Sequence, residues 1–95
     1  MVLTNYRYHG IFPGGNMNTH NPEQLGAAVR ARRKELQVTQ KELAMACGTG
    51  LRFIVDLEKG KPTCQIGKAL QVIQALGLRV RLDIPGVDAD KRENP

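Results

Sequence analysis

The chain has 95 residues, of which 41% are hydrophobic and 4% are aromatic, and it contains no Trp. These values predict one small domain with an aliphatic core and exclude a protein with several large cores. The net charge of +5 favours a polyanionic partner, and no apolar run is long enough to span a bilayer.

Residues 1–20 show no sustained hydrophobic period, and Pro13-Gly14-Gly15-Asn16 is a cluster that breaks regular structure. We interpret residues 1–20 as a flexible N-terminal extension. Met17 opens the segment that leads into the first helix, so residues 1–16 are expected to lie outside the fold.

A first helix is predicted to begin near Asn21, with Pro22 in its first turn and Glu23 near the positive end of the helix dipole. Its expected core face consists of Leu25, Ala28, Val29 and Leu36. The basic residues expected on its other faces are Arg30, Arg32, Arg33 and Lys34. A solvated surface is the usual fate of such a run, and phosphate contact is the alternative for some of these side chains.

Residues 39–60 contain two short helical patterns joined by Gly48-Thr49-Gly50. Thr39 and Glu42 have the spacing of a capping box, which predicts the start of the first of these helices. Ala44 is small enough for two helices to touch, and Gly48 tolerates the positive φ that a tight corner needs. The segment is therefore predicted to be a helix-turn-helix.

A fourth helix is predicted from Thr63 to Leu76, with Gly77 at its end. Its expected core face consists of Ile66, Ala69, Leu70, Ile73 and Leu76. Gly67 lies inside this helix, where glycine is unfavourable, so we expect close helix packing at that position.

After Gly77 the period changes to two, which predicts a half-buried β-strand over residues 78–85. Its apolar face, the predicted dimer interface, consists of Leu78, Val80, Leu82 and Ile84. A lone strand cannot satisfy its backbone groups, so we expect it to pair antiparallel with the same strand of a second copy. Pairing with Asn5 to Ile11 is the alternative. Residues 86–95 are expected to form a flexible tail.

In a helix-turn-helix protein the second helix enters the major groove of DNA. The outward residues expected to face bases are Leu51, Arg52, Val55 and Asp56. Arg52 matches guanine O6 and N7, whereas Asp56 either accepts from cytosine N4 or orients Arg52. The alternatives are a surface ion pair of little energetic value for Arg52 and Asp56, and a protein-binding patch for Leu51 and Val55.

The expected phosphate contacts flank that helix. Gln40 lies in the first turn of the preceding helix, where an amide and free backbone N–H groups can bind an anion. The full set of candidate DNA-binding residues is Thr39, Gln40, Leu51, Arg52, Val55, Asp56, Lys59 and Lys61.

No catalytic arrangement is evident. The chain has no serine, His9 and His20 lie in the N-terminal extension, and Glu35, Glu42, Asp56 and Glu58 are expected to be solvated. Cys47 and Cys64 are too few and too far apart for a zinc site, and we expect no disulfide between them. We therefore expect a non-enzyme with no metal and no cofactor. In the absence of a secretory signal, a cytoplasmic location is expected, associated with the nucleoid when DNA is bound.

Several of these motifs together resemble the XRE family of phage-repressor-like regulators: Thr39-Gln40, Glu42-Leu43-Ala44, Gly48, Ile54 and Glu58-Lys59-Gly60-Lys61. The run from Leu51 to Thr63 and that from Ile66 to Leu78 are similar to HipB-type antitoxins of that family. The resemblance implies a mainly α fold, a lambda-repressor-like bundle of four helices over residues 21–77, with a dimerising C-terminal β-strand. The sequence departs from the family at two positions. Thr49 replaces the usual aliphatic residue after the turn glycine, and Gly50 replaces the usual Ser or Thr cap of the second helix of the motif, so that helix is expected to start more loosely.

The resemblance also implies a function. It is that of a dimeric repressor that binds palindromic operator DNA, autoregulates its operon, and is the antitoxin of a HipA-type serine/threonine kinase. The alternatives are a plain XRE-type regulator without a toxin and a protein-binding module that neutralises a kinase.

Overall fold

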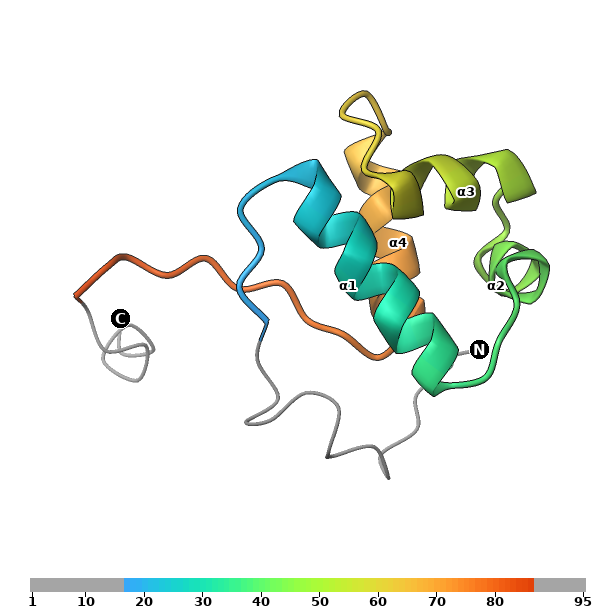
Figure 1. The fold of residues 1–95 in the computed structure, drawn as a ribbon, viewed down its shortest axis with the longest axis horizontal. Helices are drawn as coiled ribbons and strands as arrows, with labels where there is room; N and C mark the ends of the chain where they lie inside the picture. The colour runs from blue at the N-terminus through green and yellow to red at the C-terminus, as the bar shows by residue number, and fades with distance from the viewer. Residues whose placement is uncertain (1–16, 87–95) are drawn as a thin grey trace.

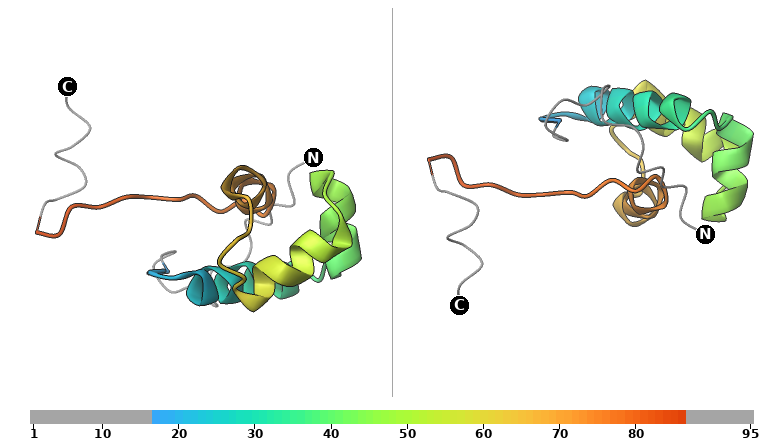
Figure 2. Two further views of the ribbon diagram at one scale, coloured as in Figure 1. Left: turned by 90° about the horizontal axis from the view of Figure 1, so that it is seen from above. Right: turned by 90° about the horizontal axis from the view of Figure 1, so that it is seen from below.

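The computed structural model describes residues 17–86. This part of the chain contains four helices, α1 (Pro22–Glu35), α2 (Gln40–Cys47), α3 (Leu51–Lys59) and α4 (Ile66–Ala75). Figure 1 shows α2 and α3 to the right of α1, with α4 behind α1. In Figure 2, α1 and α3 share one layer, α4 forms a second layer, and α2 closes one end. The predicted four-helix bundle is confirmed.

The core is aliphatic and receives side chains from all four helices. Its buried members are Val29, Leu43, Ala44, Ile54, Leu57, Ala69, Val72, Ile73 and Leu76. Leu25 and Leu36, which were expected in the core, are partly buried and pack against its edge. Burial of these apolar side chains away from water is the main force that holds the four helices together.

The starts of α1 and α2 follow from local capping. The Asn21 side chain accepts a hydrogen bond from the Gln24 backbone N–H at 2.7 Å, and Pro22 lies in the first turn of α1. At α2 the Thr39 hydroxyl accepts from the Glu42 backbone N–H at 3.0 Å, and Glu42 Oε1 accepts from the Thr39 backbone N–H at 2.9 Å. The predicted capping box is confirmed.

Glycine permits two kinds of tight geometry in this fold. Gly48 ends α2 with φ of 69°, as the predicted corner requires. A Cβ added at Gly26 in α1 would lie 2.3 Å from the Leu57 carbonyl oxygen, so α1 and α3 touch backbone to backbone there. At Gly67 an added Cβ would meet nothing within 4 Å. The expected close packing at Gly67 is wrong, and the close approach occurs at Gly26 instead.

The start and face of α4 differ from the prediction. The Cys64 backbone N–H donates to the Lys61 carbonyl at 3.4 Å, which forms a turn over residues 61–64. This turn delays the helix, which begins at Ile66 and not at Thr63. The residues that face the core are Ala69, Val72, Ile73 and Leu76. Ile66 and Leu70, expected in the core, are 75% and 45% exposed because no described helix covers their side of α4.

Residues 78–86 run away from the bundle as an extended segment (Figures 1 and 2). Leu78 packs against the edge of the core, whereas Val80, Leu82 and Ile84 are exposed. No β-strand is present among residues 17–86, so the strand expected over residues 78–85 is not confirmed. A β-strand is completed only by a second strand that shares its backbone hydrogen bonds, and the described residues include no second strand.

Some expectations fall outside the described part of the chain. Residues 1–16 of the predicted extension, the alternative pairing segment Asn5 to Ile11, and residues 87–95 of the predicted tail lie outside residues 17–86. Within residues 17–86, no helix has the length and apolar character needed to cross a membrane.

Candidate nucleic-acid interface

Helix α3 has a buried face and an outward face. Ile54 and Leu57 are buried in the core, one turn apart. The Arg52 side chain is 81% exposed, and Leu51 is also exposed. Gly50 occupies the N-cap position of α3 and, as its lack of a side chain requires, supplies no capping hydrogen bond. Val55, the third apolar residue expected on the outward face, is partly buried.

Asp56 is held by two cations and is largely buried. Its side chain is 16% exposed, with Oδ1 3.3 Å from Arg52 Nε and Oδ2 3.5 Å from Lys61 Nζ. The Lys61 backbone N–H also donates to the Asp56 carbonyl at 3.0 Å. This geometry favours Asp56 as the residue that orients Arg52, over Asp56 as an acceptor for cytosine, because both carboxylate oxygens already face cations.

The N-terminus of α2 lies beside α3 and has backbone donors to spare. The first N–H groups of a helix have no acceptor within the helix, and Thr39 caps only that of Glu42. The backbone N–H groups of Gln40 and Lys41 therefore remain for an outside acceptor. The Gln40 side chain is engaged, since Nε2 donates to Glu58 Oε1 at 3.1 Å.

Glu58 and Arg33 form a buried ion pair that the sequence did not predict. Arg33 Nε lies 2.6 Å from Glu58 Oε2, and Arg33 Nη2 donates to Glu58 Oε1 at 3.0 Å. Arg33 Nη1 also donates to the Val38 carbonyl at 2.8 Å. The expectation that Arg33 and Glu58 are solvated is wrong, because their side chains are only 10% and 3% exposed. The pair joins α1 to α3.

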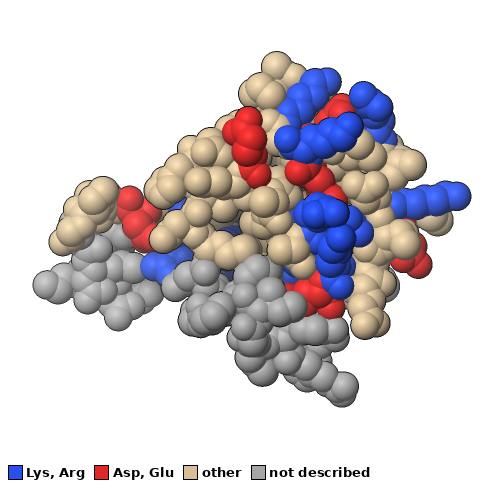
Figure 3. Space-filling view, viewed as in Figure 1, with Lys and Arg blue, Asp and Glu red and all other residues tan. Residues whose placement is uncertain are grey.

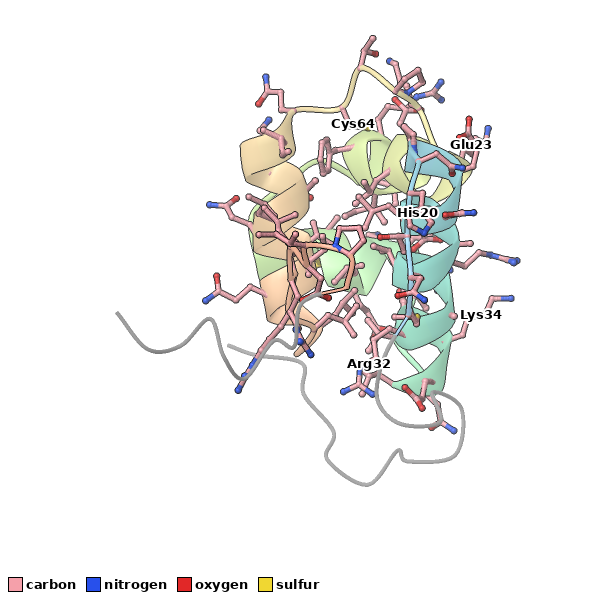
Figure 4. The ribbon with its side chains drawn as sticks, turned by 90° about the vertical axis from the view of Figure 1, so that its left-hand side faces the viewer. His20, Glu23, Arg32, Lys34 and Cys64 are labelled. Carbon is pink, nitrogen blue, oxygen red and sulfur yellow. The ribbon has the colours of Figure 1, made fainter. Side chains whose placement is uncertain are left out.

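A second buried pair lies at the end of α1. Arg32 Nη1 donates to Glu35 Oε1 at 2.6 Å, and Arg32 Nε donates to the Leu76 carbonyl at 2.9 Å. Glu35 Oε2 is buried and has no hydrogen-bond partner in the described part of the chain. Arg32 and Glu35 were also expected to be solvated, and that expectation is wrong. Figure 4 shows Arg32 at one end of α1 and Lys34 pointing away from the bundle.

Helical spacing was the signal that could have identified the buried arginines. Arg33 lies seven residues after Gly26 and four after Val29, on the face of α1 that packs on α3. Arg32 has the same relation to Leu25 and Ala28. An arginine on an apolar stripe needs a buried acceptor, and the acceptors come from α3 and from the end of α4.

The remaining basic residues of this part of the molecule are exposed. They are Arg30, Lys34, Lys41, Arg52, Lys59 and Lys61. In Figure 3 most of the visible Lys and Arg side chains gather over the part of the molecule that α1, α2 and α3 form. Such a concentration of positive charge beside an exposed helix attracts a polyanion.

The described residues show no arrangement typical of metal binding or of a reactive thiol. Among residues 17–86, no group of three or more His, Cys, Asp or Glu side chains could hold a metal ion. Cys47 and Cys64 are free thiols that pack against the core. Burial raises the pKa of the Cys47 thiol, which disfavours its reactive thiolate form.

Comparisons with known proteins agree with this geometry. The chain matches the helix-turn-helix family over residues 29–82. It is 58% identical over 65 residues to y4mF of Sinorhizobium fredii, an uncharacterized HTH-type transcriptional regulator. The aligned region covers 68% of this chain and 86% of that protein. It is 39% identical over 62 residues to an uncharacterized HTH-type transcriptional regulator of Methanothermobacter thermautotrophicus, covering 65% of this chain and 90% of that protein.

Solved structures share the fold. A HipB–O4 20mer complex superposes with a TM-score of 0.68 at 24% identity, over 74% of this chain and 99% of that chain. A HipA–HipB–O2–O3 complex gives the same TM-score of 0.68 and the same identity of 24%, over 74% of this chain and 99% of that chain. A HipB–O1–O2 complex gives a TM-score of 0.67 at 25% identity, over 73% of this chain and 100% of that chain.

Proposed function

Because the chain belongs to the XRE-type helix-turn-helix family of transcriptional regulators, we propose that it is a dimeric repressor that reads operator DNA with α3. We further propose that it is the antitoxin partner of a HipA-type serine/threonine kinase. In this proposal, residues 21–77 are the DNA-binding domain and residues 78–85 form the dimerisation strand.

The observation that carries DNA binding is the exposure of Arg52 on α3 beside a basic surface. Its side chain is 81% exposed and its guanidinium is within 3.3 Å of the Asp56 carboxylate, which restricts its orientation. An oriented guanidinium is suited to bidentate contact with guanine. Leu51 is exposed one residue earlier and is assigned to a thymine methyl, whereas the partly buried Val55 has a smaller share in the contact.

Phosphate contacts are assigned on either side of α3. The backbone N–H groups at the start of α2 and the Gln40 amide bind one phosphate. Thr39 contributes by capping α2. Lys59 and Lys61, both exposed, bind the backbone at the other end of α3.

Dimerisation is supported by the apolar side chains that the single chain leaves exposed. Val80, Leu82 and Ile84 are 54%, 82% and 58% exposed and alternate along an extended segment. Antiparallel pairing with the same segment of a second copy places these side chains together on one face of a two-stranded sheet. Ile66 and Leu70 on α4 extend this apolar surface, and Ile66 also borders an open hollow of about 300 Å³ lined partly by Leu25 and Leu57.

The antitoxin role is supported by the names of the solved structures that share the fold. They include a HipB–O4 20mer complex and a HipA–HipB–O2–O3 complex, so HipB assembles with HipA. A plain regulator without a toxin shares every DNA-binding feature, but the HipB neighbours do not favour it. A module that neutralises a kinase, with DNA binding secondary, gives the basic surface around α3 only a minor role.

Gel-shift titration against the promoter of its own operon, repeated at several salt concentrations, tests DNA recognition. We expect affinity for that promoter to exceed affinity for unrelated DNA by at least about a thousandfold. Equal affinity for all sequences with a steep salt dependence would reduce the protein to a nonspecific DNA binder.

The dimer and the toxin have separate tests. Val80→Asp places a charge on the proposed apolar face and is expected to halve the mass in solution, whereas Arg79→Ser, on the opposite face, is expected to leave it unchanged. A monomeric parent protein, or a dimeric Val80→Asp variant, would refute pairing through this segment.

Co-purification with the product of the neighbouring gene tests the antitoxin role, and failure to co-purify would leave a repressor without a toxin.

A further inference from the structure

The Gln40 amide has one N–H group engaged inside the protein and a second one left over. A primary amide nitrogen carries two N–H donors, whereas a carboxylate only accepts. The 3.1 Å contact with Glu58 Oε1 therefore identifies the Gln40 atom facing α3 as Nε2 and uses one of its N–H groups. The side chain is partly exposed, so the second N–H remains available to an acceptor outside the protein.

Glu58 is itself held in place from another helix. Both of its carboxylate oxygens receive hydrogen bonds from Arg33, at 2.6 and 3.0 Å, and its side chain is 3% exposed. Arg33 is fixed in turn by its bond of 2.8 Å to the Val38 carbonyl, in the segment just before α2. One carboxylate thus connects α1, α3 and the first residue of α2, and it has little freedom to move.

We propose that Glu58 is a positioning residue for DNA binding, because it fixes the Gln40 amide with its second N–H directed to a DNA phosphate. The proposal rests on the proposed function, in which Gln40 contacts phosphate. Holding the amide before DNA arrives removes rotamer entropy that the contact would otherwise cost. It also prevents the amide from turning its oxygen, an acceptor, toward the phosphate.

The proposal is distinguishable from simple electrostatics because the two effects have opposite signs. Glu58 carries a negative charge beneath the surface that is proposed to face a polyanion, so its neutralisation strengthens DNA binding if charge alone matters. If Glu58 positions Gln40, neutralisation weakens binding. In Glu58→Gln the new side chain has an N–H group as well as an oxygen, so it no longer selects the orientation of the Gln40 amide.

The experiment measures affinity of the full chain for its operator and for an unrelated duplex, in a thermodynamic cycle of Gln40→Ala, Glu58→Gln and the double variant. Gln40→Ala and Glu58→Gln are each expected to weaken both affinities about tenfold, the equivalent of about 1.4 kcal/mol. Glu58→Gln is expected to cause no further loss in the Gln40→Ala background. The matched control is Glu42→Gln, which removes the same charge from the start of α2 but preserves the capping box, and its affinity is expected to stay equal or rise.

The outcomes distinguish the Gln40–phosphate contact from the positioning of Gln40 by Glu58. If Gln40→Ala binds as the parent does, the phosphate contact itself is absent and that part of the proposed function fails. If Gln40→Ala weakens binding but Glu58→Gln does not, or weakens it equally in both backgrounds, the positioning role is overturned while the contact stands.

A measurement on the unmodified protein keeps the test available if Glu58→Gln does not fold. The two side-chain N–H protons of Gln40 have separate NMR signals. We expect the proton on the Glu58 side to keep its chemical shift when operator DNA is added, and the other proton to move. Movement of both protons, or of neither, would overturn the proposal.

Discussion

Two regions of the molecule differ in which side chains they bury. The first is the unit formed by α1, α2 and α3, and the second is the C-terminal region formed by α4 and residues 77–86. In the first unit the charged groups Arg33 and Glu58 are buried together, and glycine brings α1 against α3. In the C-terminal region apolar groups such as Ile66 and Leu82 are exposed, and Gly67 has open space beside it. The first unit has a basic exterior, whereas the C-terminal region completes the core with Ala69, Val72, Ile73 and Leu76 and leaves an apolar surface exposed.

The largest expected effect comes from breaking the buried ion pair of the first unit. Arg33→Met is expected to lower the free energy of unfolding by about 3–5 kcal/mol, because it leaves the Glu58 carboxylate buried without its cation. Urea unfolding at fixed protein concentration measures it. The control Arg30→Met removes an exposed charge from the same helix and is expected to change stability by less than about 0.5 kcal/mol. Equal effects for both variants would show that the pair does not stabilise this unit.

The two glycines that lie within helices sharpen the comparison of packing. Gly26→Ala is expected to destabilise by about 3 kcal/mol, because its Cβ would lie 2.3 Å from the Leu57 carbonyl oxygen and α1 would have to move. Gly67→Ala adds the same methyl group in open space and is expected to stabilise by up to about 1 kcal/mol. Thermal unfolding of both variants measures the difference. A destabilised Gly67→Ala variant would mean that another chain approaches α4 at that point.

Two cations of the first unit are expected to differ in how they bind DNA. Arg52→Ala is expected to cost about 1–3 kcal/mol at the operator and to relax the choice of one base pair. Lys61→Ala is expected to weaken all sequences alike and to reduce the salt slope by about one unit. Binding to a panel of operator variants separates them, and unchanged specificity in Arg52→Ala would contradict its assignment as a base reader.

The smallest expected effect is a pH dependence at the start of α2. The hydrogen bond from the Thr39 backbone N–H lowers the pKa of the Glu42 carboxyl from its ordinary value of 4.5. A depressed pKa in the folded state contributes stability above the ordinary value, and that contribution is lost as the pH falls below 4.5 and through the folded pKa. The melting temperature of the parent should therefore fall more than that of Glu42→Gln between about pH 6 and pH 3. Parallel curves would show that Glu42 makes no such contribution.

Local signals account for what could be predicted from the sequence. Thr39 and Glu42 lie three residues apart, and Gly48 follows at the end of the same short helix, so the capping box and the corner were identifiable. The outward position of Arg52 follows from the helical period and from the burial of Ile54 and Leu57. These features depend on neighbours within one or two turns.

Long-range and intermolecular contacts account for what could not be predicted. Arg33 and Glu58 are 25 residues apart, and Arg32 reaches the Leu76 carbonyl across 44 residues, so only the folded chain brings them together. Periodicity predicts an apolar face on α4 but not whether anything covers Ile66. Periodicity predicts a strand over residues 78–85 but not which second strand pairs with it.

The position of the Arg33–Glu58 pair has a consequence for how this protein can evolve. The pair joins α1 to α3, and none of its hydrogen bonds involves Leu51 or Arg52. Residues at these outward positions of α3 can therefore be substituted while the Arg33–Glu58 pair keeps its geometry. After gene duplication, copies of such a protein can diverge toward separate regulatory targets through a few substitutions, without first passing through poorly folded intermediates.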